Sequence, residues 1–238
     1  MIRKFLHFTL KMKIMFIGHY ASAFALKGAV PKTSLGMLFV ATQFVDILFF
    51  PFVNLGIERL KIVPHYTAST HFDLEYYPFT HGLLATVLWS LLFYWVYRYL
   101  VNNGKSFSKQ VAWAMGLAVL SHWFADLIVH THDLPLLGDH SPKMGFGLWN
   151  YRHLTFATEV SLLVLGLMYY LRKTKGHSFW GKYGAILFTG FMIFAGYLNL
   201  YILPPPENTM ALMISALVSY GIFSVLAAFV DKARHANS

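Results

Sequence analysis

No cysteine occurs in the 238-residue chain, so disulfide bonds and thiolate metal ligands are both excluded. Charged residues are also scarce: aspartate, glutamate, lysine and arginine make up 12% of the sequence, whereas 57% of it is hydrophobic. A soluble domain of this length needs more charged surface to cover its core. The composition therefore predicts an integral membrane protein.

Acidic residues are fewer than basic ones, ten against nineteen, which gives a formal net charge of +9. On a soluble protein this excess would suggest binding to nucleic acid, but here the basic residues lie between apolar runs. Lysine and arginine in such places are typical of the loops that orient membrane spans. We therefore expect the lipid bilayer as a partner, and no nucleic acid.

Several apolar runs approach the ~20 residues that a helix needs to cross a hydrocarbon layer of ~30 Å. They predict an all-α integral membrane protein, a polytopic bundle of six to seven transmembrane helices. The candidate spans cover residues 14–30, 34–55, 78–100, 110–130, 153–172, 180–203 and 210–230. Residues 1–13 form a basic segment that is either an amphipathic helix or lies upstream of the true start.

Residues 14–238 are expected to form a single transmembrane domain, in which residues 14–135 carry most of the polar positions. Residues 180–238 supply two further spans, and one of them, "ALMISALVSYGIFSVLAAFV", has no charged residue. These two spans are predicted to be accessory helices that pack against the others or face lipid.

The first five spans contain ionisable side chains, each of which costs about 2.5–3.5 kcal/mol at the centre of a bilayer. They are His19, Lys27, Asp46, His81, His122, Asp126 and Glu159. Side chains of this kind usually face the interior of a bundle, where they pair with one another or meet water. His122 and Asp126 are four residues apart, which places them on one face of a helix.

Helical rise predicts that several of these groups share a level. His19 lies 12 residues before Pro31, and Asp46 lies 12 residues after Ser34, which can cap the second helix. At 1.5 Å per residue both are ~18 Å from the turn between the two helices. His81 begins the third span, and His122 ends the fourth, on the same side of the membrane. The sequence thus predicts one polar layer near one boundary of the bilayer.

Imidazole and carboxylate groups without thiolate suit Zn²⁺, with Mn²⁺ and Fe²⁺ as alternatives. The predicted metal ligands are His19, Asp46, His81, His122 and Asp126. A bound Zn²⁺ would lower the pKa of water to about 7, so the layer predicts a metal-dependent hydrolase of esters or phosphoesters at the membrane interface. Asp126 and Asp46 are the candidates for its general base.

Other polar residues are candidates for the surroundings of the site. Lys27, His130 and Arg152 could bind an anionic group of a lipid-like or other small-molecule substrate, although a snorkelling role is favoured for Lys27. His130 and Asp133 could orient His122. Glu159 is either a further ligand or the partner of Arg152, and the pair is favoured.

Three segments carry a resemblance to a known family: "FIGHYASAFALKGAVPKTSLGMLFVATQFVDILFFP", "YYPFTHGLLATVLWS" and "LSHWFADLIVHTHDLPL". Over about residues 16–135 they resemble the bacterial membrane-bound, LexA-regulated metal-dependent hydrolases. The resemblance implies that the metal-site motifs of the family correspond to His19, Asp46, Thr80–His81 and Ser121–His122 with Asp126. The second-helix motif of the family, P-D-x-D, is reduced here to one aspartate in "TQFVDILF", and the arginine common before T-H is absent.

Two other classes of function remain open. A transporter or channel would use the same histidines and aspartates to relay protons or ions, and a scaffold would use them only to lock helices together. We expect a bacterial inner-membrane protein. The basic residues are almost evenly divided between the two sides, and the first 13 decide the balance. A start at Met12 or Met15 would place the polar layer on the extracytoplasmic side, which is the side we favour.

Overall fold

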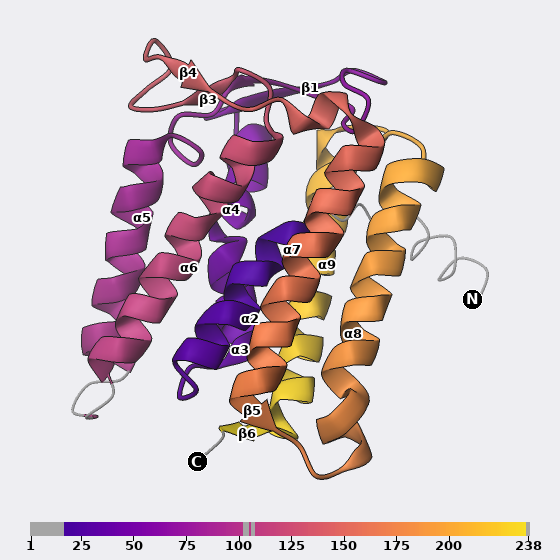
Figure 1. Ribbon diagram of the computed structural model, residues 1–238. Coiled ribbons are helices and arrows are strands. Elements are labelled where there is room, and N and C mark those ends of the chain that lie inside the picture. Colours follow the sequence, from indigo (N-terminus) through magenta and orange to yellow (C-terminus); the bar gives the residue numbers. More distant parts are fainter. Residues whose placement is uncertain (1–16, 102–104, 106–107, 237–238) are drawn as a thin grey trace.

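The structure is a computed structural model that describes residues 17–101, 105 and 108–236. Most of this chain is helical, and the long helices stand side by side in an upright bundle (Figure 1). The predicted N-terminal segment, residues 1–13, and the first residues of the first predicted span lie outside the described residues. The helical bundle of the described residues fits the all-α expectation.

The described α-helices follow the predicted spans with changed boundaries. They are α2 (Tyr20–Ala29), α3 (Leu35–Thr42), α4 (Phe44–Asn54), α5 (Leu83–Trp95), α6 (Ser108–Val129), α7 (Arg152–Lys173), α8 (Phe179–Tyr197) and α9 (Thr209–Lys232). Short 3-10 helices, Ile17–His19 and Leu148–Asn150, lie just before α2 and α7, and π-helical turns, Val96–Val101 and Leu198–Ile202, extend α5 and α8. Side chains of Ser34, Ser178 and Asn208 cap α3, α8 and α9.

Five of the described helices are long and apolar enough to cross a membrane, namely α5 to α9, counting the π-helical turns of α5 and α8. A sixth span is formed if α3 and α4, which are bent by 46° where they meet, are counted together. The first predicted span is shorter than expected, because α2 has ten residues and rises only ~15 Å. In the described part of the chain, it does not reach across a ~30 Å hydrocarbon layer.

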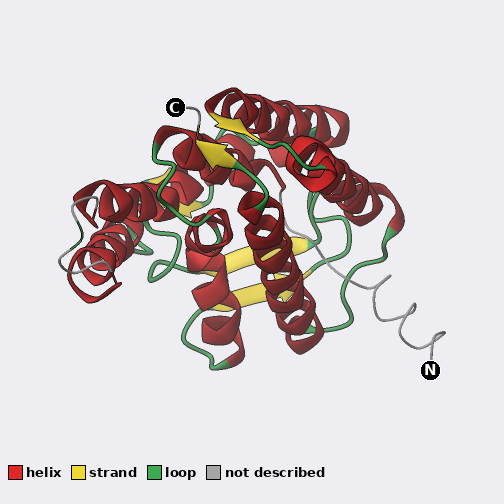
Figure 2. Ribbon diagram, turned by 90° about the horizontal axis from the view of Figure 1, so that it is seen from below, coloured by secondary structure: helices red, strands yellow, loops and turns green. Residues whose placement is uncertain are grey.

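Short strands cover both ends of the bundle, which the sequence did not predict. At the upper end in Figure 1, β1 (Arg59–Ile62) pairs with β2 (Phe72–Tyr76), and β3 (Leu134–Pro135) pairs with β4 (Lys143–Met144). We call these two hairpins and their loops, residues 55–82 and 130–151, the cap. At the other end, seen in Figure 2 near the C-terminus, β5 (Thr174–Lys175) pairs with β6 (His235–Ala236).

The buried apolar residues form two clusters, one around α2, α3 and α6 and the other beneath the cap. In the first, the ring of Tyr20 stacks on that of Phe39, with centroids 4.2 Å apart. In the second, the ring centroids of Phe49 and His81 are 5.0 Å apart. His19 directly precedes Tyr20 of the first cluster, and His81 contacts Phe49 of the second. The predicted polar layer therefore lies where the two clusters meet.

The position of α2 depends on its close contact with α7. A Cβ atom added at Gly166 would lie 2.5 Å from the carbonyl oxygen of Ala21, so only glycine allows this approach. At the start of the helix, a Cβ atom on Gly18 would lie 3.1 Å from the Cα and Cγ atoms of Glu159. These contacts place His19, the next residue, against the interior of the bundle.

We predict that Gly166→Ala lowers the free energy of unfolding by about 1–3 kcal/mol, because the new methyl group forces α2 and α7 apart. Gly190→Ala on α8 is the matched control, since a Cβ atom there has no neighbour within 4 Å. Alanine also favours a helix over glycine by about 1 kcal/mol, so the control should be neutral or stabilising. Denaturant unfolding in detergent measures both, and equal effects would contradict the prediction.

Candidate metal centre

The five predicted ligand residues lie together beneath the cap, in the interior of the bundle. Their side chains come from different elements, and each residue is only 2–5% exposed. They are His19 at the start of α2, Asp46 on α4, His81 in the turn before α5, and His122 and Asp126 on α6. The predicted convergence on one layer is thus what the structure shows, although the layer is covered rather than open.

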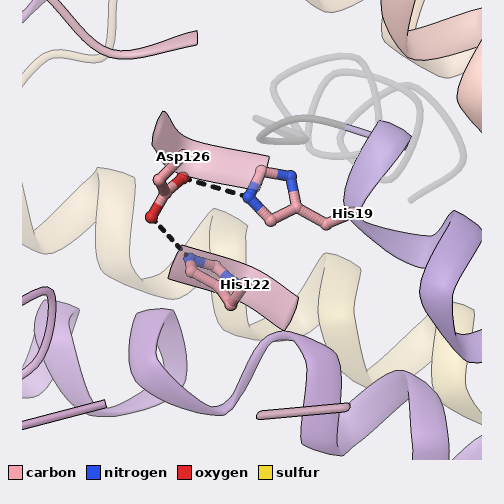
Figure 3. A group of neighbouring side chains, drawn as sticks. All are labelled: His19, His122 and Asp126. Atoms are coloured by element: carbon pink, nitrogen blue, oxygen red, sulfur yellow. Dashed lines mark hydrogen bonds and ion pairs between the residues drawn. The ribbon is translucent and has the colours of Figure 1, made fainter. Parts of the chain in front are cut away.

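Asp126 lies between two histidines, with each carboxylate oxygen turned toward a different ring (Figure 3). Its Oδ1 atom is 3.0 Å from Nε2 of His19, and its Oδ2 atom is 3.2 Å from Nε2 of His122. The rings of His19 and His122 are 4.4 Å apart. These three residues have ligand atoms within 4.8 Å of one another, close enough to hold a metal ion.

Asp46 completes a second set of three that shares His122. Its Oδ1 atom is 3.1 Å from Nε2 of His81 and 3.7 Å from Nε2 of His122. The ligand atoms of this set also lie within 4.8 Å of one another. Both sets are buried, so the described residues offer two overlapping groups that can bind a metal ion.

The proton on His122 is assigned by its outer hydrogen bond. Nδ1 lies 2.7 Å from the carbonyl oxygen of Thr42. Thr42 is the last residue of α3, and carbonyl groups in the last turn of a helix lack partners within the helix. Because a carbonyl oxygen can only accept, Nδ1 of His122 carries the proton. Nε2 therefore faces the carboxylates of Asp46 and Asp126, to which it donates when the ring is protonated and beside which it can bind a cation when the ring is neutral.

The same logic applies to His81 through a chain of two cap residues. The hydroxyl of Thr80 donates to Oε2 of Glu58 at 2.8 Å, so it accepts from Nδ1 of His81, also at 2.8 Å. Oε1 of Glu58 accepts from the backbone N–H groups of Phe79 and Thr80. Burial raises the pKa of Glu58, while the charge of His81 and these hydrogen bonds oppose the rise. Nε2 of His81 thus also faces inward, 3.1 Å from Oδ1 of Asp46, to which it donates when the ring is protonated.

Two residues of this centre were missed by sequence reasoning. Glu58 lies in a loop whose sequence contains several other charged residues, and no spacing relates it to His81. Tyr220 donates from its hydroxyl to Oδ2 of Asp46 at 2.7 Å. It belongs to α9, which was expected to be an accessory helix, so that expectation is wrong at this position. A buried tyrosine in an apolar helix needs a hydrogen-bond partner, which is the only signal the sequence offered.

The two inward carboxylates of the centre, Asp46 and Asp126, are surrounded mainly by histidines. In the part of the chain that the structure describes, lysine ion pairs involve Asp231, Glu75 and Asp139, and none reaches Asp46 or Asp126. Two buried carboxylates therefore depend on the neighbouring histidines for compensation of their charge. A bound cation, or protonation of the histidines, is needed to make this arrangement favourable, because an uncompensated buried charge is costly.

His130 and Asp133 lie beside the centre, as their predicted role in its surroundings requires. Nδ1 of His130 is 3.0 Å from Oδ1 of Asp133, and the ring packs against Trp149 with centroids 4.1 Å apart. Nε2 of His130 lies 3.6 Å from Oδ1 of Asp126. His130 therefore contacts Asp126, whereas the sequence suggested that it orients His122.

Three other predicted residues lie elsewhere. Lys27 forms an ion pair with Asp231 at 2.9 Å near the end of the bundle away from the cap, so it does not contact the centre. The Nε atom of Arg152 donates to the carbonyl oxygen of Ala68 at 2.6 Å. Glu159 accepts from the backbone N–H groups of Ile17 and Gly18. It thereby binds the N–H groups at the start of a helix, in place of the favoured pair with Arg152.

Comparison with protein-family models, with curated proteins and with solved structures found no match for this chain. The resemblance to membrane-bound hydrolases therefore depends on the quoted motifs, and the function must be argued from the geometry of the centre.

We predict that Thr80→Val lowers the free energy of unfolding by about 1–3 kcal/mol, because it leaves buried polar atoms of His81 and Glu58 without partners. Thr80→Ser keeps the hydroxyl and should recover most of this loss. The ¹⁵N chemical shifts of His81 provide a second readout, since Nδ1 loses its fixed acceptor only in the valine variant. Unchanged shifts in Thr80→Val would show that Thr80 does not select the tautomer.

Proposed function

We propose that this protein is a membrane-embedded, metal-dependent hydrolase, with Zn²⁺ as the favoured ion, that cleaves an ester or phosphoester at the membrane interface. The observation that carries the proposal is the inward position of Nε2 of both His81 and His122 beside the carboxylates of Asp46 and Asp126. Each is directed at a carboxylate oxygen, and each is fixed by an outer acceptor on Nδ1. Outer hydrogen bonds of this kind are typical of histidines that bind metals.

The distances between donor atoms also fit such an ion. Tetrahedral ligands about 2.0–2.1 Å from Zn²⁺ are separated from one another by about 3.3 Å. Nε2 of His122 lies 3.2 Å from Oδ2 of Asp126 and 3.7 Å from Oδ1 of Asp46. Nε2 of His81 lies 3.1 Å from that Asp46 oxygen and 3.8 Å from Oδ2 of Asp126. Small side-chain shifts would bring Nε2 of both histidines and Oδ2 of Asp126 to one ion, with Oδ1 of Asp46 beside its open position.

A divalent ion held there supplies the Lewis acidity that lowers the pKa of water toward neutrality. Asp126 has both carboxylate oxygens turned to histidines and is the better ligand. Asp46 is anchored through Oδ2 by Tyr220, which leaves Oδ1 to accept a proton from water. We therefore assign the general base to Asp46. A lipid-like or anionic substrate would approach under the cap, where the centre is nearest to the membrane boundary.

We predict that purified protein contains Zn²⁺ and that His122→Ala and Asp126→Ala lose it. Asp46→Asn should retain most of the metal, because the other three ligands remain, but lose about 10²–10⁴-fold in turnover because it lacks a general base. Metal analysis and a screen of model esters and phosphoesters, with and without chelator, test this.

The matched control is His153→Ala, since His153 is exposed and bonds Tyr201 outside the centre. It should keep both metal and activity. Folded wild-type protein that never binds metal would contradict the proposed hydrolase and favour a scaffold or a proton path. Stoichiometric metal without hydrolysis of any model substrate, but with metal-dependent ion flux in vesicles, would favour the transporter.

Membrane orientation can be tested directly because the chain has no cysteine of its own. His140 in the cap and His177 beyond β5 are both exposed histidines, at opposite ends of the bundle. With an extracytoplasmic centre, a membrane-impermeant maleimide should label His140→Cys in cells whose inner membrane is intact. His177→Cys should react only after permeabilisation. The reverse pattern would place the centre on the cytoplasmic side.

A further inference from the structure

A second polar site lies at the end of the bundle opposite the cap, where β5 pairs with β6 (Figure 1). The segment between α7 and α8 and the residues after α9 form a shallow, open pocket of about 370 Å³ there. Most of the side chains around it are basic, and none is acidic. The pocket is lined by Lys175, His177, Lys182 and Arg234, together with Leu171 and Thr174.

Three segments of the chain are held together at this pocket by close backbone contacts. A Cβ atom on Gly176 would lie 2.2 Å from the carbonyl carbon and oxygen of Gly181, and one on Gly181 would lie 2.4 Å from the carbonyl oxygen of Ala233. Strand pairing joins Thr174–Lys175 to His235–Ala236. The backbones that carry the basic side chains are therefore fixed relative to one another.

Arg234 is the least exposed of the pocket's cations, and neutral groups hold its side chain. Nε donates to the hydroxyl of Thr174 at 2.8 Å, and the terminal nitrogens donate to the carbonyl oxygens of Gly181 and Thr174. Burial lowers the pKa of the Arg234 guanidinium, while the nearby Tyr170 and Asp231 oppose this shift. These contacts orient the guanidinium without pairing it directly with a carboxylate.

The surroundings of the pocket have an excess of positive charge. Residues 171–182 and 232–236 contain six lysines and arginines and no aspartate or glutamate. Lys175 and Lys182 are exposed and take part in none of the ion pairs formed by the described residues. Asp231, just before the second of these segments, is already paired with a lysine of α2 at 2.9 Å. A concave site lined by charges of one sign attracts a counter-ion, here an anion.

The ends of the neighbouring helices place this pocket at the level of a membrane boundary. α7 ends and α8 begins beside it, and both are long and apolar enough to cross a membrane. Trp180 and Tyr183, in the first turns of α8, are each 50% exposed. Exposed tryptophan and tyrosine at the end of a span are typical of the headgroup region. The anion that a bilayer presents at this level is the phosphate group of a phospholipid.

We propose that this pocket binds the phosphate group of an anionic phospholipid through Lys175, Lys182 and Arg234. Lysine and arginine form strong, charge-assisted hydrogen bonds with phosphate oxygens. Basic pockets between transmembrane helices are typical sites for anionic lipid headgroups. The site lies at the other end of the bundle from the candidate metal centre, and the inference does not depend on the proposed hydrolase.

The test is native mass spectrometry of detergent-purified full-length protein titrated with phosphatidylglycerol. Wild type should bind one such lipid in preference to phosphatidylcholine. Lys175→Gln/Lys182→Gln should raise the dissociation constant of this lipid about fivefold for each lysine removed. The matched control is Lys105→Gln/Lys109→Gln, which removes two exposed lysines just before and within the first turn of α6, at the same end of the bundle. It should bind the lipid as wild type does.

Lys182→Gln alone is the second variant if the double variant fails to fold, as judged by circular dichroism and gel filtration. Equal weakening in the pocket and control variants would overturn the inference, because it would show general attraction to a basic surface. Equal binding of phosphatidylglycerol and phosphatidylcholine by wild type would also overturn it. Displacement of the lipid by an equal concentration of inorganic phosphate would assign the pocket to a soluble anion instead.

Discussion

The burial of two carboxylates among histidines is the constraint on which the arrangement of this protein depends. Removing a carboxylate from water costs several kcal/mol even after relaxation, and no lysine or arginine in the described chain is paired with Asp46 or Asp126. Tyr220 relieves one oxygen of Asp46, and His19 contacts one oxygen of Asp126. The remaining contacts between histidine nitrogens and carboxylate oxygens are favourable with protonated histidines or with a bound cation.

Helices near the centre break or begin at positions where their backbone or side chains contribute to the centre. The break between α3 and α4 places the carbonyl of Thr42 beside His122, and the start of α2 within the bundle delivers His19. Helix ends inside a hydrocarbon layer are tolerated only where other parts of the protein satisfy their polar groups. Here Glu159 does so for the backbone of Ile17 and Gly18. Polar side chains and polar backbone groups thus satisfy one another's hydrogen bonds in the same layer.

The cap contributes to the centre through hydrogen bonds as well as by covering it. Glu58 holds Thr80, which holds His81, and Asp133 holds His130. Each outer carboxylate fixes the protonated nitrogen of one histidine and turns its other nitrogen inward. The hairpins that carry these residues therefore have a defined part in building the centre, which explains why loops between spans should contain ordered strands.

The sequence by itself determined the features that follow from short-range geometry. The four-residue spacing of His122 and Asp126, and the equal distances of His19 and Asp46 from one turn, were enough to predict that they converge, because helical rise is fixed. Only the tertiary structure decided the partners that are distant in sequence, such as Glu58 with Thr80, Tyr220 with Asp46, and Lys27 with Asp231. Packing between helices selects those contacts, and no local pattern in the chain encodes them.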